Sequence, residues 1–147
     1  MTLVLFTILI NLVNKMHITK VLGRDFVICV LLQGGWENDE TVEQAAAREA
    51  VEEAGVRGDI VQFLGFYDFK SKTLQYACCP EGMCRAAVFA LHVKEELASW
   101  PEQSTRRRTW LTVSEATSQC RYQWMQEALL TGFSDWHDNW SKGSGDA

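Results

Sequence analysis

Four residues that can do chemistry together lie close to one another in the sequence, namely Arg48, Glu49, Glu52 and Glu53. Carboxylate oxygens are the ligands that Mg²⁺ prefers, and a carboxylate can also take a proton from water. Like charges three or four positions apart on a helix repel each other by roughly 0.2–0.5 kcal/mol per pair, whereas a divalent cation between them would reverse the sign. The other interpretation is a solvated helix face without a ligand, which is the commonest fate of a charge run.

The segment that carries these residues has the start and stop signals of a helix. Thr41 and Gln44 have the spacing of a capping box, strong helix formers follow, and Gly55 suits a left-handed residue after the last turn. The sequence therefore predicts a helix over residues 43–54.

This predicted helix has one acidic side and one apolar side. At about 100° per residue, the three glutamates lie within roughly 100° of one another. Ala47, Val51 and Ala54 point to the opposite side. We therefore expect these three residues to pack against the rest of the protein.

The remaining apolar segments indicate an α/β sandwich. Strands are expected over residues 25–32, 60–69, 84–93 and 109–111. Ser114 is expected to cap a short helix, and a C-terminal helix should begin near Tyr122. Its apolar residues recur every three or four positions and are expected to form core: Met125, Ala128, Leu129, Phe133, Trp136 and Trp140. Strands that flank helices in this order favour a sandwich over a helix bundle.

The composition is that of one globular domain. The chain has 147 residues, of which 47% are hydrophobic and 22% charged, and this suffices for a single core. A net charge of −5 argues against a nucleic acid polymer as partner. The five cysteines include no C-x-x-C pair, so neither a disulfide framework nor a zinc site is expected. We expect an intracellular protein with reduced thiols.

The N-terminal region is the least typical part of the chain. Residues 3–13 are almost entirely apolar, but a helix of this length would cover only about 16 Å of a hydrocarbon core of about 30 Å. No basic residue precedes the run and no typical cleavage site follows it. We therefore expect a buried strand or an atypical terminus, and no membrane anchor.

The spacing around the glutamates carries a resemblance to a known family. From Gly34 to Val56 the sequence reads G-x5-E-x7-R-E-A-x-E-E-x-G-V, which resembles the Nudix hydrolase signature at every position. The resemblance implies an α/β/α sandwich around a mixed sheet. It also implies Mg²⁺- or Mn²⁺-dependent hydrolysis of nucleoside diphosphate derivatives or related pyrophosphates.

The resemblance also implies roles for the residues of this signature. Glu49 and Glu53 match the metal ligands, and Glu52 matches the general base, although relatives differ in which glutamate activates water. Arg48 joins Glu52 in the expected catalytic set because it can orient carboxylates through charge-assisted hydrogen bonds. The supporting positions of the signature are Gly34, Gly35, Glu40 and Gly55.

Residues 34–140 further resemble the plant-type branch related to diphosphoinositol polyphosphate phosphohydrolases. That branch acts on diphosphoinositol polyphosphates and dinucleoside polyphosphates, so the expected partner is a densely anionic small molecule. The candidate cationic contacts are Arg106, Arg108, Lys70, Lys72, Arg85 and Arg121. Strand alternation favours Arg106 and Arg108 together, and the alternative is an ordinary solvated loop.

Residues 1–33 do not resemble that branch, so the expected domain core is residues 34–140, followed by a flexible tail over residues 141–147. Either the apolar N-terminus supplies substitute strands, or the sheet is incomplete. The second case leads to an alternative function, a non-catalytic Nudix-like module that binds pyrophosphate. We expect the cytoplasm or the nucleus, and the branch also has mitochondrial members. The sequence leaves the exact substrate, the number of metal ions and the oligomeric state open.

Overall fold

A mixed sheet lies at the centre of the fold in the computed structural model, which describes residues 3–7, 26–32, 39–70, 83–105, 108, 110–120 and 122–143. Within these residues the sheet has five strands in the order β3-β4-β2-β1-β5. The strands are β1 (Leu3–Thr7), β2 (Phe26–Leu32), β3 (Val56–Lys70), β4 (Met83–Glu96) and β5 (Leu111–Thr112). Strand β1 runs parallel to β2, and the other pairs are antiparallel. The mixed sheet of the sequence-based prediction is therefore confirmed.

The apolar N-terminal run contributes a strand to this sheet. Strand β1 lies between β2 and β5 and pairs with both, for example Val4 with Phe26 and with Leu111. Of the two alternatives for this region, the substitute strand is the one that the structure adopts. Among the residues described, no helix combines the length and the apolar composition needed to cross a membrane.

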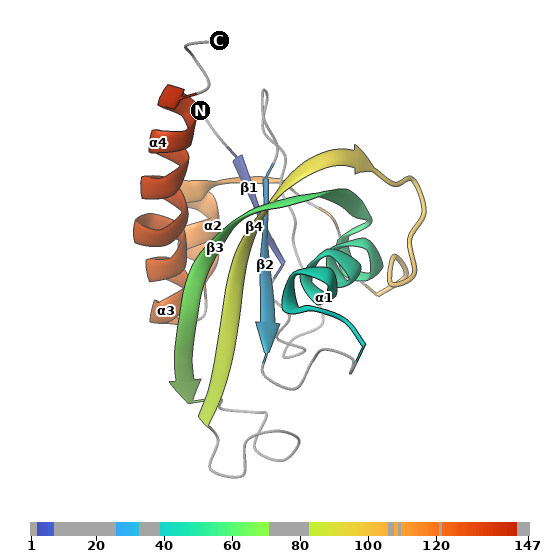
Figure 1. The fold of residues 1–147 in the computed structure, drawn as a ribbon, viewed down its shortest axis with the longest axis horizontal. Coiled ribbons are helices and arrows are strands. Elements are labelled where there is room, and N and C mark those ends of the chain that lie inside the picture. Colours follow the sequence, from blue (N-terminus) through green and yellow to red (C-terminus); the bar gives the residue numbers. More distant parts are fainter. Residues whose placement is uncertain are drawn as a thin grey trace.

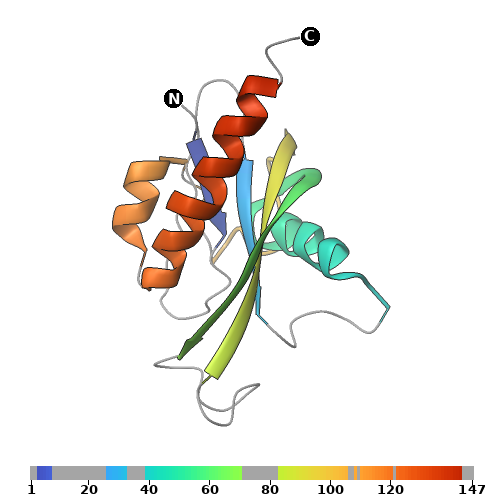
Figure 2. The ribbon, with the colours of Figure 1, turned by 60° about the vertical axis from the view of Figure 1, so that its left-hand side comes forward.

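Helices cover both faces of the sheet (Figure 1). Helix α1 (Val42–Glu49) and the wider turn η1 (Ala50–Ala54) lie on one face. The elements α2 (Val113–Gln119), α3 (Gln123–Glu127), η2 (Ala128–Phe133) and α4 (Ser134–Gly143) lie on the other. With the view turned, Figure 2 shows the sheet between the teal α1 and the orange and red helices. This arrangement is the predicted α/β/α sandwich.

Successive side chains of β4 contribute in turn to the two halves of the core, one on each face of the sheet. Ala86, Val88 and Ala90 belong to the cluster under the C-terminal helices, whereas Ala87, Phe89 and Leu91 belong to the cluster under α1. Successive side chains of a strand point to opposite faces of the sheet. A strand buried on both faces therefore reads as a continuous apolar run, as residues 86–91 do.

The packed side of the α1–η1 helix is shifted from the predicted one. The buried row is Ala46, Ala50 and Ala54, so the prediction is confirmed for Ala54. Ala47 is half-buried and packs at the margin of the same cluster, and Val51 is also only half-buried. Small side chains four positions apart stack on one side and allow the helix to lie close to the sheet. The last turn is a π-helix, so its residues are rotated relative to a regular α-helix.

The C-terminal helices follow the predicted apolar stripe. Met125, Leu129 and Phe133 are at most 1% exposed, and Trp136 and Trp140 pack at the edge of the same cluster. Phe26 of β2 inserts between these side chains, and its ring centroid lies 5.7 Å from that of Phe133. The core role of the stripe is confirmed.

Two helix ends differ from the sequence-based expectation. Thr112, not Ser114, caps α2, because Thr112 and Glu115 form a capping box that places Ser114 inside the first turn. At the C-terminus, α4 extends through Gly143, three residues into the tail that was expected to be flexible. Residues 144–147 lie outside the described part of the chain.

Leu129 and Leu130 provide a matched test of this packing. Leu129 is fully buried, whereas Leu130 is 49% exposed. We expect Leu129→Ala to lower the free energy of unfolding by about 2–5 kcal/mol, because it removes core contacts and leaves a cavity. Leu130→Ala should change it by less than about 1 kcal/mol. Urea denaturation of both variants measures the difference, and similar losses would contradict the described orientation of η2.

Candidate active site

The acidic helix begins at the predicted capping box. The Thr41 side chain accepts a hydrogen bond from the Gln44 amide at 3.1 Å, and the Gln44 side chain accepts one from the Thr41 amide at 2.8 Å. These bonds satisfy two of the backbone donors that every helix start leaves free. The capping box is thus confirmed, and it fixes where the helix begins relative to the sheet.

Arg48 joins three carboxylates into one network. Its Nε and Nη2 donate to the two carboxylate oxygens of Glu40 at 3.0 and 2.8 Å. Its Nη1 donates to Glu49 at 3.0 Å and to Glu52 at 3.2 Å. The expected charge-assisted bonds of Arg48 are therefore present, and the paired bond to Glu40 is the strong geometry for arginine and carboxylate.

The four acidic residues of this site differ in their access to solvent. The side chains of Glu40 and Glu49 are 12% and 16% exposed, whereas that of Glu52 is 40% exposed. Glu53 is buried, with 3% of its surface exposed. The predicted acidic side is therefore not a uniformly solvated face, since one of its three glutamates turns into the protein.

Partial burial and hydrogen bonding in this network change the pKa values of Glu49 and Arg48. Burial raises the pKa of the Glu49 carboxyl, Arg48 opposes this rise, and the negative charges of Glu52 and Glu102 add to it. The pKa of Arg48 is raised, mainly through its hydrogen bond to Glu40, although burial acts in the other direction. The local environment thus favours the charged form of Arg48 and disfavours the charged form of Glu49.

Gly55 ends the helix in the predicted left-handed conformation, with φ 65°. A Cβ atom at this position would lie 2.5 Å from Trp100 Cδ2, so the position needs glycine for two reasons. The Gly55 amide donates back to Val51 at 3.1 Å and closes the last turn. Strand β3 starts at the next residue, Val56.

Two residues near the glutamates were not recognised in the sequence. Glu102 donates its backbone N–H to the carbonyl of Glu52 at 3.0 Å, and its charge acts on Glu49. Trp100 packs against Gly55. Both lie in a turn after β4, and no spacing relative to the signature marks them, because the turn reaches the helix only through the fold.

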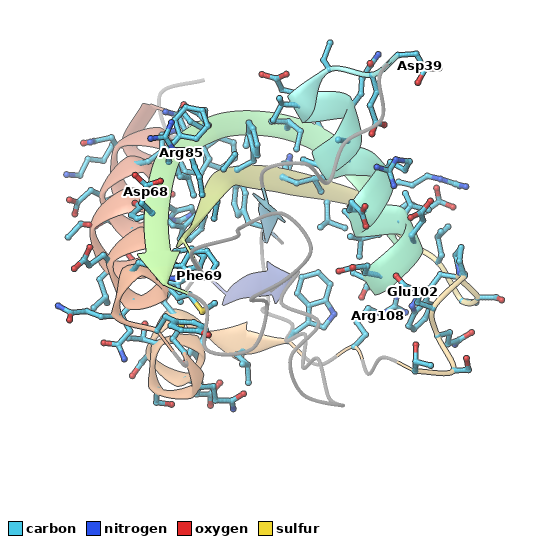
Figure 3. The ribbon with its side chains drawn as sticks, turned by 90° about the horizontal axis from the view of Figure 1, so that it is seen from below. Asp39, Asp68, Phe69, Arg85, Glu102 and Arg108 are labelled. Carbon is cyan, nitrogen blue, oxygen red and sulfur yellow. The ribbon has the colours of Figure 1, made fainter. Side chains whose placement is uncertain are left out.

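The two candidate cationic contacts whose side chains are described, Arg108 and Arg85, lie apart. Figure 3 shows Arg108 on the side of α1 and η1, whereas Arg85 of β4 lies across the molecule together with Asp68 of β3. Arg85 Nε donates to Asp68 at 2.8 Å, and both side chains are exposed. This ion pair lowers the pKa of Asp68.

For several predicted site residues the structure describes no side chain. Lys70 ends β3, but its side chain is not described. The others lie outside the described residues: Gly34, Gly35, Lys72, Arg106 and Arg121. Their roles therefore stay predictions.

The carboxylates of the site suit a hard divalent cation that takes its remaining ligands from water and substrate phosphates. Glu49 and Glu53 offer carboxylate oxygens, which Mg²⁺ favours. Within the described ranges, no group of three or more His, Cys, Asp or Glu residues is arranged to hold a metal ion. Mg²⁺ usually binds through one or two carboxylates, water and substrate phosphates, so the side chains present fit a site that its substrate completes.

The structure is thus an α/β/α sandwich in which one helix presents carboxylates that are bonded to Arg48. Comparison with known proteins agrees. The family model described as NUDIX domain matches residues 17–131. The chain belongs to this family, whose members generally use divalent metals.

Plant and animal relatives support the same assignment. The chain is 64% identical over 105 residues to Nudix hydrolase 16, mitochondrial, of Arabidopsis thaliana, covering 71% of this chain and 58% of that protein. Identity to Nudix hydrolase 13, mitochondrial, of the same plant is 50% over 119 residues, or 79% and 59% of the two chains. Identity to diphosphoinositol polyphosphate phosphohydrolase 3-alpha of Mus musculus is 33% over 85 residues, or 56% and 46%. The chain thus spans less than two thirds of the length of these relatives.

Arg48 and Arg57 allow a matched test of the network. Arg57 pairs with Glu95 at 3.4 Å on the exposed surface of β3 and β4. We expect Arg48→Met to lower the free energy of unfolding by about 1–3 kcal/mol, because it removes the donor shared by partly buried carboxylates. Arg57→Met should cost less than about 1 kcal/mol, as is typical of surface pairs. Urea denaturation compares the two, and equal costs would show that the Arg48 network adds no stability.

Proposed function

We propose that this protein is a Nudix pyrophosphohydrolase that uses Mg²⁺ or Mn²⁺ to cleave phosphoanhydride bonds of highly anionic small molecules. The observation that carries the proposal is the network in which the Arg48 guanidinium holds Glu49 and Glu52 of the signature helix together with Glu40, which precedes that helix. Such a network orients several carboxylates at short range, which a merely solvated face does not need.

The proposed roles of the three glutamates combine the family resemblance with their exposure in the structure. Glu52 is the proposed general base, because its carboxylate is the most exposed of those that Arg48 holds and can reach solvent water. Glu49 and Glu53 are the proposed metal ligands. When bound, Mg²⁺ or Mn²⁺ neutralises phosphate oxygens and lowers the pKa of water. Arg48 orients Glu49 and Glu52 through its hydrogen bonds and limits their mutual repulsion.

The proposed reaction is displacement at phosphorus. Glu52 accepts a proton from water, the water oxygen bonds to phosphorus, and the phosphoanhydride P–O bond breaks so that the leaving phosphate keeps the electron pair. No redox partner is needed. The proposal requires the carboxylate of Glu52 in its charged form, since a protonated carboxyl cannot take the proton.

Diphosphoinositol polyphosphates and dinucleoside polyphosphates are the proposed substrates. The resemblance of residues 34–140 to the diphosphoinositol polyphosphate branch supports this choice, as does the name of the mouse relative. Other nucleoside diphosphate derivatives are the wider class. We also propose an intracellular site of action, and the names of three plant relatives favour mitochondria over the cytoplasm or nucleus.

Removal of one carboxylate tests the chemistry. With Mg²⁺, the purified protein should release phosphate from a diphosphoinositol polyphosphate or cleave a diadenosine polyphosphate, and EDTA should abolish turnover. Glu52→Gln should lower kcat by about 100-fold or more, because it removes the base. The control is Glu95→Gln, whose carboxylate lies in the exposed pair with Arg57 and should leave kcat unchanged.

The same assay separates the enzyme from a non-catalytic module. Calorimetry with each substrate measures binding independently of turnover. If the wild type and Glu52→Gln both bind ligand and neither releases phosphate, the protein is a binding module and the hydrolase proposal is wrong.

A further inference from the structure

The turn that carries Glu52 and Glu53 is held by a part of the chain far from it in sequence. We call residues 97–105, which follow β4, the 97–105 segment. Its Leu97 amide donates to the Gly55 carbonyl at 2.7 Å, and its Glu102 amide donates to the Glu52 carbonyl at 3.0 Å. The last carbonyls of a helix lack partners within the helix. These two bonds therefore fix the C-terminal turn of η1 from outside.

Arg108 completes this contact from beyond the segment. Its Nη1 donates to the Gly55 carbonyl at 2.9 Å and to the Ala54 carbonyl at 3.3 Å. Its Cζ lies 4.4 Å from the centroid of the Trp100 ring, over the face of the indole. Trp100 in turn packs against Gly55. The guanidinium is thus held on its face by an aromatic ring and at its edge by two backbone oxygens.

The charge of Arg108 suits this position. The C-terminus of a helix carries a partial negative charge, and here the same turn also carries glutamates, so a cation at this end is favourable. The guanidinium offers several donors in a fixed plane, which suits neighbouring carbonyl oxygens and a stacked ring at once. A lysine could supply the charge and the donors but not the planar contact with the indole ring.

We infer that Arg108 is a positioning residue that holds the turn bearing Glu52 and Glu53, and that it is not a contact for substrate phosphate. This inference rests on the proposed function. It replaces the expectation from strand alternation, which placed Arg108 among the phosphate contacts. The side chain is half-buried, its Nη1 is already bonded to the backbone, and its flat face is covered by Trp100.

The two roles predict different kinetics. If Arg108 positions the glutamates, its loss disturbs metal binding and the proton acceptor, whereas the substrate affinity hardly changes. If Arg108 binds phosphate, its loss raises KM and leaves the metal affinity intact. Residues that support metal ligands typically contribute about 10–100-fold to affinity or activity when they are removed.

The test uses Arg108→Met, Arg108→Lys and the control Arg57→Met in the full chain. Mn²⁺ affinity is measured without substrate by electron paramagnetic resonance, and kcat and KM are measured with a diphosphoinositol polyphosphate or a diadenosine polyphosphate. For Arg108→Met we expect Mn²⁺ affinity and kcat to fall by about 10-fold each, with KM within about 2-fold of the wild type. Arg108→Lys should recover part of the loss, and Arg57→Met should match the wild type.

Each other result counts against the inference. A rise in KM with unchanged Mn²⁺ affinity would make Arg108 a substrate contact, and three unchanged parameters would leave it no role in the site. If Arg108→Met does not fold, Trp100→Leu provides the second variant, because it removes the ring under the guanidinium, and it should weaken Mn²⁺ binding in the same direction.

Mn²⁺ binding and hydrolysis by the wild type distinguish a failure of this inference from a failure of the proposed function. If the wild type binds Mn²⁺ but hydrolyses neither substrate, the proposed function fails, and the Mn²⁺ affinity of Arg108→Met still decides the positioning role. If the wild type binds no Mn²⁺ alone, the affinities are compared in the presence of inorganic pyrophosphate, and absence of Mn²⁺ binding there would make both proposals wrong.

Discussion

The bonds from Arg48 to its carboxylates are the interaction on which this site depends. Glu40 and Glu49 are mostly shielded from water, and charges that lose hydration need a partner to remain charged. One guanidinium supplies that partner to Glu40, Glu49 and Glu52 at once. Burial nevertheless raises the pKa of Glu49, and the negative charges of Glu52 and Glu102 add to this rise. This cluster is costly to assemble, and its members are held in fixed positions. Such an arrangement suits the binding of a divalent metal together with a phosphate chain.

The helix that carries this cluster is placed by its smallest residues. Ala46, Ala50 and Ala54 are completely buried against the sheet, where β4 offers Ala87, Phe89 and Leu91. Because alanine side chains are short, the helix can approach the sheet closely. The opposite layer, built by the aromatic residues of α3, η2 and α4, stabilises the other face of the sheet. The site therefore rests on both cores, although Glu49, Glu52 and Glu53 all belong to α1 and η1.

The C-terminal end of the helix is capped differently from its N-terminal end. The start is capped locally, by Thr41 and Gln44 three residues apart. The end is capped by the 97–105 segment and by Arg108, about fifty residues further along the chain. This difference has a functional consequence, because the distant contact joins the turn with Glu52 to the end of β4. A change in the loop after β4 can then move the turn that bears Glu52 and Glu53 without touching any residue of the signature.

Much of the local structure was determined by the sequence itself. The capping box, the helix up to Gly55, the strand that became β2 and the aromatic stripe of the C-terminal helices depend on spacing between near neighbours, and all of them are present in the structure. The signature also located the four residues of the Arg48 network. Tertiary structure decided which helix side is packed, since the π-helical turn and the sheet select Ala46 and Ala50 over Ala47 and Val51. It also decided that Glu53 is buried, that Arg108 reaches the backbone of Ala54 and Gly55, and that Glu102 acts on Glu49. Periodicity and motifs report only what lies within a few turns along the chain, whereas these contacts join segments that meet only after the sheet has formed.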